Sequence, residues 1–436
     1  MKSQNITPTP PEKEKIIENK ELSIWEALIP IVILVGMLFY NVYYAFGDDA
    51  LSGSNQFILL LGAAVAAVVG FFNKVSYKQM MEEVSRNIKS TSGALLILLM
   101  VGSLAGTWLI SGIIPTMIYY GLQILNPTIF LAASVLICAI ISIATGSSWT
   151  TSATVGIALI GIGDTLGISL GMTAGAVISG AYFGDKMSPL SDTTNLAPAM
   201  AGGELFSHIK YMTYTTIPTI LITLLIFIII GFTIDTSGTP EISSQLTAIN
   251  EAFTISPWLF VVPLLVIILI IKKTPPLIAL LAGTLLGALA AIIAQPSIVM
   301  SIAGSDTLDF LSAYKGIMQA MTVDTAVETS SKELNDLFTA GGMSGMLGTI
   351  WLIICAMVFG GVMDAIGALA RISKALLSLF DSVFGLFAST ALSCVVLNAT
   401  ASDQYLAIVV PGRMYSKAFK DKGLAPENLS RTLEDT

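Results

Sequence analysis

Oxygen-bearing side chains gather in one short segment that follows an apolar run. Its carboxylates are Asp185 and Asp192, and neutral oxygens accompany them at Ser188, Ser191 and Asn195. Hard cations such as sodium prefer carboxylate, hydroxyl and carbonyl oxygens as ligands. Asp192 is the leading candidate for a sodium ligand because neutral oxygens lie on both sides of it. The segment therefore predicts a cation-binding site.

The same segment is expected to break a membrane helix. Residues 170–183 form an apolar run, and Pro189 cannot continue a regular helix. Polar groups persist at membrane depth only where protein or water surrounds them. A break that lines a cavity is the favoured interpretation, and an ordinary loop is the alternative. Asp185 and Lys186 have two open roles: substrate binding, or structural pairing with each other or with residues elsewhere.

Two further polar stretches interrupt long apolar runs, at 146–152 and at 398–404. A small-residue helix contact is the alternative reading of the first. The second holds Asp403, an ionisable residue that needs a function or a counter-charge inside a membrane. The neutral ligands that the two stretches offer are Ser148, Thr151, Asn398 and Thr400. We expect the two tips to meet beside Asp192, where sodium and one shared proton would compete for the two carboxylates.

The composition places these residues in a polytopic membrane protein. Of 436 residues, 54% are hydrophobic and only 11% are charged, and the mean hydropathy is +0.81. Ordinary soluble domains carry about 25% charged residues. The net charge of −8 argues against nucleic-acid binding, and no nucleotide-binding or hydrolase motif is present, so an enzyme is not expected. The single histidine, His208, is interpreted as a solvated residue at the membrane interface.

Basic residues flank the apolar runs unevenly, which predicts an orientation. The positive-inside rule places the N-terminus and the basic loop 73–90 in the cytoplasm. The run 384–410 has bases on both flanks, so we expect a re-entrant hairpin from the cytoplasm. The run 128–163 has no bases on its flanks and predicts a hairpin from outside. Two halves with hairpins of opposite orientation describe an inverted repeat, a common construction of secondary transporters.

The predicted fold class is therefore all-α, with inverted repeats, two re-entrant hairpins and broken helices. The expected parts are a disordered cytoplasmic tail at 1–23, scaffold helices at 24–92, a first repeat core with hairpin and broken helix at 93–204, scaffold helices and an external segment at 205–342, and a second repeat core at 343–436.

Three motifs make the chain similar to the NhaC family of sodium/proton antiporters. They are Gly106-Thr107-Trp108 leading to 114–121, the stretch 144–148, and the long stretch 179–195 that contains the polar segment. The resemblance covers most of the chain from about residue 24. It implies a multi-pass protein of the bacterial plasma membrane that exchanges sodium for protons without a cofactor. The family also includes sodium- and proton-coupled exchangers of malate and lactate, so a small organic acid is the alternative substrate.

The resemblance also raises an expectation about the end of the chain. An offset of 252 residues between the halves puts the counterpart of Asp185 at or just beyond Thr436. The second repeat core is therefore expected to be incomplete at the C-terminus. The oligomeric state is left open, a homodimer included.

Overall fold

The protein is helical almost throughout. The computed structural model describes residues 22–124, 127–189, 191–233, 242–272, 274–330, 332–378, 382–401 and 404–436. Within these ranges the extended structure is one antiparallel pair, β1 (Thr325–Ala326) and β2 (Thr339–Ala340). Thr325 pairs with Ala340 and Ala326 with Thr339. The predicted all-α class is confirmed.

Several helices are long and apolar enough to cross a membrane. Within the described residues there are six, or seven if a pair of helices bent by 83° counts as one broken span. The six are Ile24–Phe46, Ser54–Phe72, Thr91–Ile110, Leu205–Thr233, Pro276–Ala294 and Ser344–Ala365, and the bent pair is Ser243–Ala252 with Pro257–Ile270. The chain is therefore a multi-pass membrane protein. Its apolar runs are more numerous than these spans because several runs fold into shorter helices, such as Pro127–Ile143 and Val383–Asn398.

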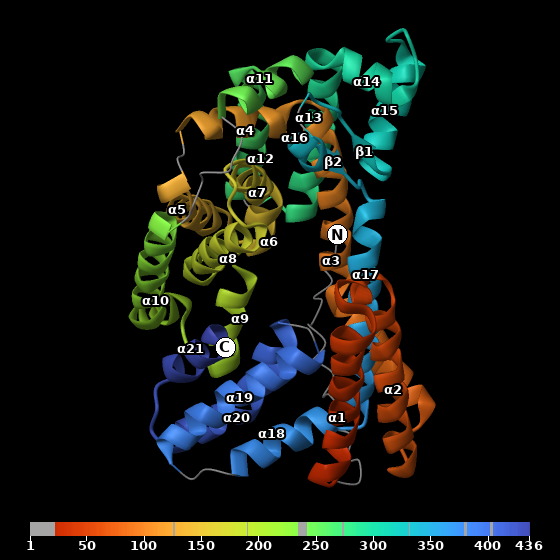
Figure 1. The fold of residues 1–436 in the computed structure, drawn as a ribbon. Coiled ribbons are helices and arrows are strands. Elements are labelled where there is room, and N and C mark those ends of the chain that lie inside the picture. Colours follow the sequence, from red (N-terminus) through yellow and green to blue (C-terminus); the bar gives the residue numbers. More distant parts are fainter. Residues whose placement is uncertain are drawn as a thin grey trace, which may run out of the picture.

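One bundle combines the first three helices of the chain with helices from about residue 347 onward (Figure 1). Buried side chains such as Leu34, Val84 and Phe359 form its core. Two of its helices begin with reciprocal capping boxes, at Ser23 with Glu26 and at Ser76 with Gln79. Its elements are α1 (Ile24–Tyr40), the π segment η1 (Asn41–Phe46), the 3₁₀ turn η2 (Gly47–Ser52), α2 (Ser54–Phe72), α3 (Tyr77–Ile110), α17 (Leu347–Ala365) and α18 (Ala368–Ser378).

A second and larger cluster surrounds the other end of the long helix α3. Trp108 is buried at its centre and donates its indole N–H to the carbonyl of Gly283, 3.1 Å away. The elements packed there are α4 (Ile113–Ile124), α5 (Pro127–Thr145), α6 (Ser148–Thr151), η3 (Ser152–Gly156), α7 (Ile157–Thr165), α8 (Leu170–Met187), α10 (Leu205–Thr233), α11 (Ile242–Ala252), η4 (Pro257–Phe260), α12 (Val261–Ile271), α13 (Pro276–Ala294), α14 (Pro296–Ala303), α15 (Phe310–Thr322), α16 (Lys332–Leu337) and η5 (Ser344–Met346).

The third cluster joins the end of the first half of the chain to the C-terminus. Its core includes Ala197, Tyr415 and Leu433, all buried. It is formed by α9 (Asp192–Ala201), α19 (Val383–Ala401), α20 (Gln404–Asp421) and α21 (Pro426–Asp435). Figure 1 shows α18, α19 and α20 lying across the lower part of the molecule, with α21 below α8 and α9. Residues far apart in sequence therefore meet around α9.

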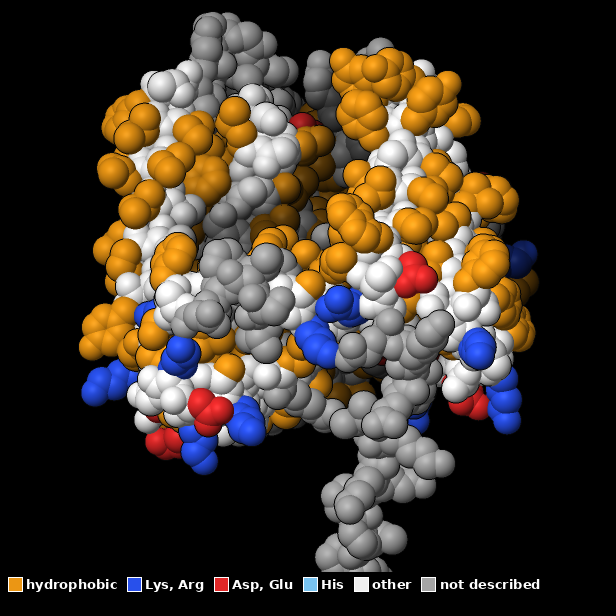
Figure 2. Space-filling view, turned by 90° about the horizontal axis from the view of Figure 1, so that it is seen from below, with side chains coloured by type: hydrophobic (Ala, Val, Ile, Leu, Met, Phe, Trp, Pro, Cys, Tyr) orange, Lys and Arg blue, Asp and Glu red, His pale blue; other side chains and the backbone are white. Residues whose placement is uncertain are grey.

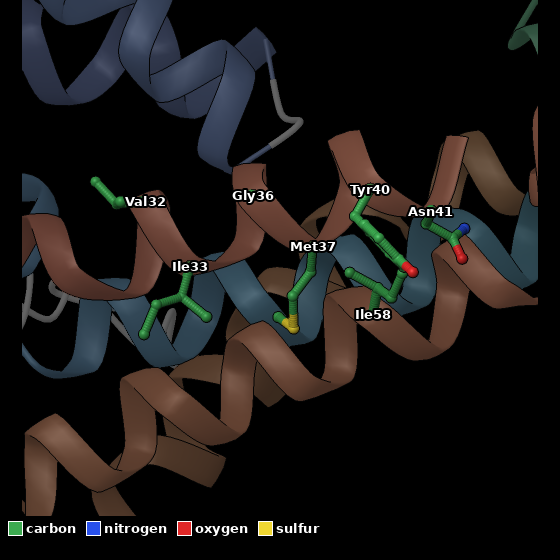
Figure 3. A pocket seen from close by; sticks show the side chains of 7 residues that line it. All are labelled: Val32, Ile33, Gly36, Met37, Tyr40, Asn41 and Ile58. Carbon is green, nitrogen blue, oxygen red and sulfur yellow. The ribbon is translucent and has the colours of Figure 1, made fainter. Parts of the chain in front are cut away.

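The outer surfaces fit a membrane environment. Seen from below, hydrophobic side chains cover much of the molecule, and lysine and arginine side chains are scattered over the lower part (Figure 2). A groove of about 510 Å³ runs between α1 and α2 (Figure 3). Its lining is Val32, Ile33, Gly36, Met37, Tyr40, Asn41 and Ile58, so it is mostly apolar and far less suited to an ion than the polar segment. Which face meets the cytoplasm, and whether the hairpins are re-entrant, stay predictions.

Candidate ion-binding site

The chain leaves α8 through a short non-helical link before α9 begins. Ser188 is extended, with φ −90° and ψ 128°, because a residue that precedes proline is excluded from the helical region. Ser191 then caps α9, accepting a hydrogen bond from the backbone N–H of Thr194 at 3.4 Å. The predicted break in the helix is confirmed, while its depth in the membrane stays a prediction.

A second break lies opposite, where α5 ends. Gly146 adopts a left-handed conformation with φ 69°, which glycine reaches without strain, and its N–H donates to the carbonyl of Ser142 at 2.8 Å. The chain resumes at Ser148 as α6 and passes through the π segment η3 into α7. Short π segments inside helices are frequent at functional sites. This break corresponds to the first predicted polar tip.

Two glycines on α8 bring these breaks together. A side-chain carbon at Gly180 or Gly184 would overlap atoms of α5, so the two helices approach closely only because both residues lack one. The hydroxyl of Ser142 donates to the carbonyl of Ala181 at 2.5 Å across the same interface. The polar tip after α5 is thus held beside the C-terminal turn of α8.

Asp185 is the carboxylate that this arrangement encloses. It is 9% exposed, and its Oδ2 atom accepts the backbone N–H of Ser148 at 3.2 Å and the Ser148 hydroxyl at 2.7 Å. The hydroxyl of Thr194, in the first turn of α9, donates to the backbone carbonyl of Asp185 at 3.1 Å. Elements on both sides of the two breaks therefore converge on one residue.

Glu434, near the end of α21, is a second buried carboxylate at this place. The hydroxyl of Thr193 donates to its Oε1 atom at 2.9 Å, and the hydroxyl of Thr194 lies 3.5 Å from the same atom. Its Oε2 atom is buried and has no hydrogen-bond partner within the described part of the chain. A buried carboxylate oxygen without a partner is costly unless a proton or a cation satisfies it.

The charge state of Glu434 responds to its surroundings. Its helix, α21, is not among the helices apolar enough to span a membrane. Burial raises the pKa of Glu434 to about 7; the bond from Thr193 and the charge of Lys186 act in the opposite direction, and the charge of Asp185 raises it further. Glu434 can therefore hold or release a proton near neutral pH.

Further contacts dock α21 against the rest of the molecule. The Lys186 ammonium lies 3.5 Å from the carboxylate of Asp435. His208 is fully buried, and its Nδ1 atom lies 2.8 Å from the hydroxyl of Ser430. The interpretation of His208 as a solvated residue was wrong, because α21 covers it. Tyr211 adds a hydrogen bond to Asn428 at 2.8 Å and a cation–π contact with Arg431, whose guanidinium carbon lies 4.5 Å from the ring centroid.

The open role of Lys186 is answered in part by this docking. Its recorded ion-pair partner is Asp435, far along the sequence, while Asp185 is bound by Ser148. The pairing with residues elsewhere is therefore present in the structure. A role in substrate binding stays a proposal.

Other predicted ligands lie close to this site but bond to the backbone. The hydroxyl of Ser188, which is buried, donates to the carbonyl of Ile143 at 2.8 Å, and that of Thr151 donates to the carbonyl of Ser147 at 2.9 Å. The amide of Asn195 donates to the carbonyls of Pro189 and Ser191 at 3.0 and 2.6 Å. In these positions the side chains stabilise the two breaks.

Of the remaining predicted ligands, the structure fully describes only Asn398. Asn398 is half-buried in α19. The side chains of Asp192 and Thr400, and all of Asp403, lie outside the described residues. Their roles in ion binding, and the meeting of the two tips beside Asp192, stay predictions.

Sequence reasoning did not identify Glu434 and Asp435 as site residues. The repeat offset pointed near them, since it placed the counterpart of Asp185 within two residues of Asp435. The polar, amphipathic character of α21 gave no sign that it packs against α9, because only tertiary contacts bring it there.

The geometry suits a cation that exchanges with a proton. Asp185 and Glu434 offer two carboxylates, to which the hydroxyls of Ser148 and Thr193 donate. The Thr194 hydroxyl joins the two residues by bonding to the backbone carbonyl of Asp185 and lying 3.5 Å from Oε1 of Glu434. Hard cations favour such an all-oxygen set. Two neighbouring buried carboxylates resist simultaneous ionisation without a cation.

Comparison with known proteins finds relatives over most of the chain. A profile of the Na⁺/H⁺ antiporter family matches residues 180–436. The chain is 36% identical to the Na⁺/H⁺ antiporter NhaC of Alkalihalophilus pseudofirmus over 377 residues, which cover 86% of this chain and 79% of that protein. It is 35% identical to the malate-2H⁺/Na⁺-lactate antiporter of Bacillus subtilis over 87% of this chain and 78% of that protein. The arginine/ornithine antiporter ArcD of Halobacterium salinarum is 33% identical over 98% of this chain and 85% of that protein.

The matched residues include the end of α8, the break before α9 and the whole of α21, so both Asp185 and Glu434 lie within them. Relatives that are at least 33% identical extend it over most of the remaining chain. The chain belongs to the Na⁺/H⁺ antiporter family, as its NhaC-like motifs predict.

Proposed function

We propose that this protein exchanges sodium for protons across the bacterial plasma membrane, with the exchange site at Asp185 and Glu434. The observation that carries the proposal is the buried Oε2 atom of Glu434, which has no hydrogen-bond partner among the described residues and lies beside a second buried carboxylate. Two relatives named as Na⁺/H⁺ antiporters support the choice of ions. The exchange needs no cofactor.

Competition for the same oxygens makes the exchange obligatory. An empty site carries the negative charges of its carboxylates, and moving such charges through a low-dielectric region is strongly unfavourable. Sodium or a proton neutralises part of this charge, so only a loaded site crosses. Ser148, Thr193 and Thr194 would complete the shell around the ion. Asp192 and Asp403 remain proposed ligands that would join them if the second polar tip reaches the site.

Reconstitution tests this function directly. We expect an inward sodium gradient imposed on proteoliposomes of the purified protein to drive protons outward, seen as alkalinisation of an internal pH dye. A potassium gradient of the same size, applied with the membrane potential clamped, is the control. An internal pH that does not respond to sodium contradicts the proposal.

A second candidate is exchange of a small organic solute coupled to these ions. A relative named as a malate-2H⁺/Na⁺-lactate antiporter favours it, as does the position of Lys186 beside a cavity next to the carboxylates. Uptake of labelled malate or lactate by vesicles, with and without sodium, separates the two candidates. Sodium-dependent uptake of either acid would support the second.

A further inference from the structure

A cavity of about 380 Å³ lies between α8 and α10, beside the proposed ion site. Figure 1 shows α8, α10 and α21 in neighbouring positions, and α10 packs against the other two. Eight of the ten residues that line the cavity carry a polar group, and the other two are Phe183 and Ile220. Apolar cavities stay dry, whereas a polar cavity of this size has room and partners for several water molecules. The cavity is therefore suited to water and to hydrated ions.

A stripe of hydroxyl groups runs along the α10 side of the cavity. Thr215, Thr219 and Thr223 line it at intervals of four residues, so they share one face of the helix over roughly 12 Å. The hydroxyls of Thr215 and Thr219 donate to the carbonyls of Met212 and Thr215 at 3.1 and 2.8 Å. Each hydroxyl keeps lone pairs that can accept hydrogen bonds from water or bind a cation. The stripe therefore offers a succession of oxygens to a hydrated cation.

Thr216 gives an independent sign that this wall is hydrated. It lines the cavity and is 8% exposed, yet its hydroxyl has no hydrogen-bond partner among the described residues. A buried hydroxyl without a protein partner is usually completed by water. On the facing helix, the hydroxyl of Ser179 donates to the carbonyl of Gly175 at 2.7 Å and keeps its lone pairs for the cavity. Water can therefore bond to both walls.

An ion pair marks the end of the cavity that is nearest to α21. The Lys186 ammonium, in the last turn of α8, lies 3.5 Å from the carboxylate of Asp435, and both residues line the cavity. Each follows a carboxylate of the proposed site in the chain, Asp185 or Glu434, which are 9% and 7% exposed and do not line the cavity. Burial raises the pKa of Glu434, and the nearby charge of Lys186 acts against this effect. The pair therefore stands between the cavity and the two buried carboxylates.

We infer that the cavity is the water-filled entry to the ion site, and that the Lys186–Asp435 pair closes its inner end. The inference rests on the proposed exchange site, because it supplies the path to that site. The two side chains are 25% and 28% exposed, and ion pairs as accessible as this one contribute little to stability, so the pair opens readily. A cation that arrives at Asp435 competes with the Lys186 ammonium for one carboxylate. The charges of Asp185 and Glu434 then attract it inward, and they repel an anion.

Cysteine labelling tests whether the cavity holds water. The full chain without Cys138, Cys355 and Cys394 is reconstituted in proteoliposomes, with a cationic methanethiosulfonate on both sides of the membrane. Thr219→Cys should react at least roughly tenfold faster than Leu221→Cys, because a thiol that faces hydrocarbon does not form the reactive thiolate. Leu221 is a matched control, since it is 59% exposed on α10 and does not line the cavity. Equal rates, or no reaction at either position, would overturn the entry.

A thiol behind the ion pair tests the closure. Glu434→Cys should react slowly in the same background, and adding Lys186→Gln should speed its reaction roughly twofold to fivefold, as the small energy of an exposed ion pair allows. Adding Lys186→Arg, which keeps the pair, should retain the slow rate. A neutral hydrophilic thiosulfonate should show the same increase, because the lost charge of Lys186 by itself favours only the cationic reagent. An increase with the cationic reagent alone would overturn the closure.

Loosening of the whole helix α21 needs its own control. Ser430, on the same helix, is fully buried and lies against His208. If only the pair opens, Ser430→Cys should stay unreactive with and without Lys186→Gln. Equal acceleration at positions 430 and 434 would show that the pair only docks α21, which would contradict the closure. Labelling as expected without sodium-driven proton movement would contradict the exchange proposal alone, whereas exchange by a protein whose Thr219→Cys variant is unreactive would contradict the entry alone.

Discussion

Ser148 holds one carboxylate oxygen of Asp185 with two donors, its backbone N–H at 3.2 Å and its hydroxyl at 2.7 Å. The first donor belongs to the turn after Gly146 and the second to the side chain itself. The turn after α5 and the last turn of α8 are thereby fixed to each other at the proposed ion site.

Removal of the Ser148 hydroxyl should weaken sodium binding. In Ser148→Ala one charge-assisted bond to Asp185 and one candidate sodium ligand are lost, so the KM for sodium should rise roughly tenfold. Sodium-dependent proton movement in proteoliposomes measures it. Ser134→Ala, which removes a buried α5 hydroxyl that bonds to the carbonyl of Phe130, should leave the KM unchanged. A native KM in Ser148→Ala would exclude Ser148 from the site.

The docking of α21 should weaken as the pH rises through about 7. Burial raises the pKa of Glu434 from 4.5 in the unfolded chain to about 7 in the folded one, so the folded state binds the proton more tightly. The stabilisation is complete below pH 4.5 and is lost as the pH passes 7, by at most about 3 kcal/mol. Hydrogen exchange of the amides in 426–435 should therefore speed up between about pH 4.5 and pH 7 beyond the intrinsic effect of pH, and show no further excess above pH 7.

Glutamine at this position separates Glu434 from other groups. Glu434→Gln cannot ionise, so the pH-dependent part of the exchange in 426–435 should disappear. Glu427→Gln, in the first turn of the same helix, should keep it. The same pH dependence in native protein and Glu434→Gln would show that another group controls α21.

The close approach of α5 and α8 should not tolerate a side chain at Gly184. A methyl group there would meet Ser142 and the backbone of α5, so Gly184→Ala should destabilise the protein by about 1–3 kcal/mol and slow exchange by displacing Asp185. Thermal unfolding in detergent and proteoliposome exchange measure the two effects. Gly171→Ala, at an exposed position early in α8, should be neutral in both. Equal behaviour of the two variants would refute the packing argument.

Labelling should place both flanks of the apolar run 384–410 on one side of the membrane. Lys374 and Lys417 are exposed on either side of α19 and part of α20. In a background without Cys138, Cys355 and Cys394, cysteines at these positions should both react from the cytoplasmic side. Labelling from opposite sides would make the run a crossing, and the inverted-repeat interpretation would fall with it.

The sequence predicted the two helix breaks, which depend on local residue types, but it did not predict which residues pack around them. Pro189, Gly146 and the oxygen-rich segment each act on their own backbone, so the two helix breaks follow from residue types alone. The approach of α21 depends on packing between segments about 240 residues apart, such as Thr193 with Glu434. Such contacts leave no local pattern.

The burial of His208 escaped prediction for the same reason. A histidine at the start of an apolar helix has the pattern of an interfacial residue, and only the presence of Ser430 against it changes that reading. The sequence likewise favoured Asp192 over Asp185, because neutral oxygens surround Asp192 along the chain. The structure gives Asp185 its neutral oxygens from Ser148, on another helix.

Asp185 is a carboxylate of the proposed exchange site, and neutralising it tests that proposal most directly. Asp185→Asn, Asp192→Asn and the exposed control Asp164→Asn should be reconstituted side by side and driven by the same sodium gradient. Asp185→Asn should abolish sodium-driven proton movement while Asp164→Asn exchanges at the native rate, with equal amounts of folded protein in the membranes. Loss of exchange in Asp192→Asn as well would add that residue to the site. Native-rate exchange by Asp185→Asn would contradict the account.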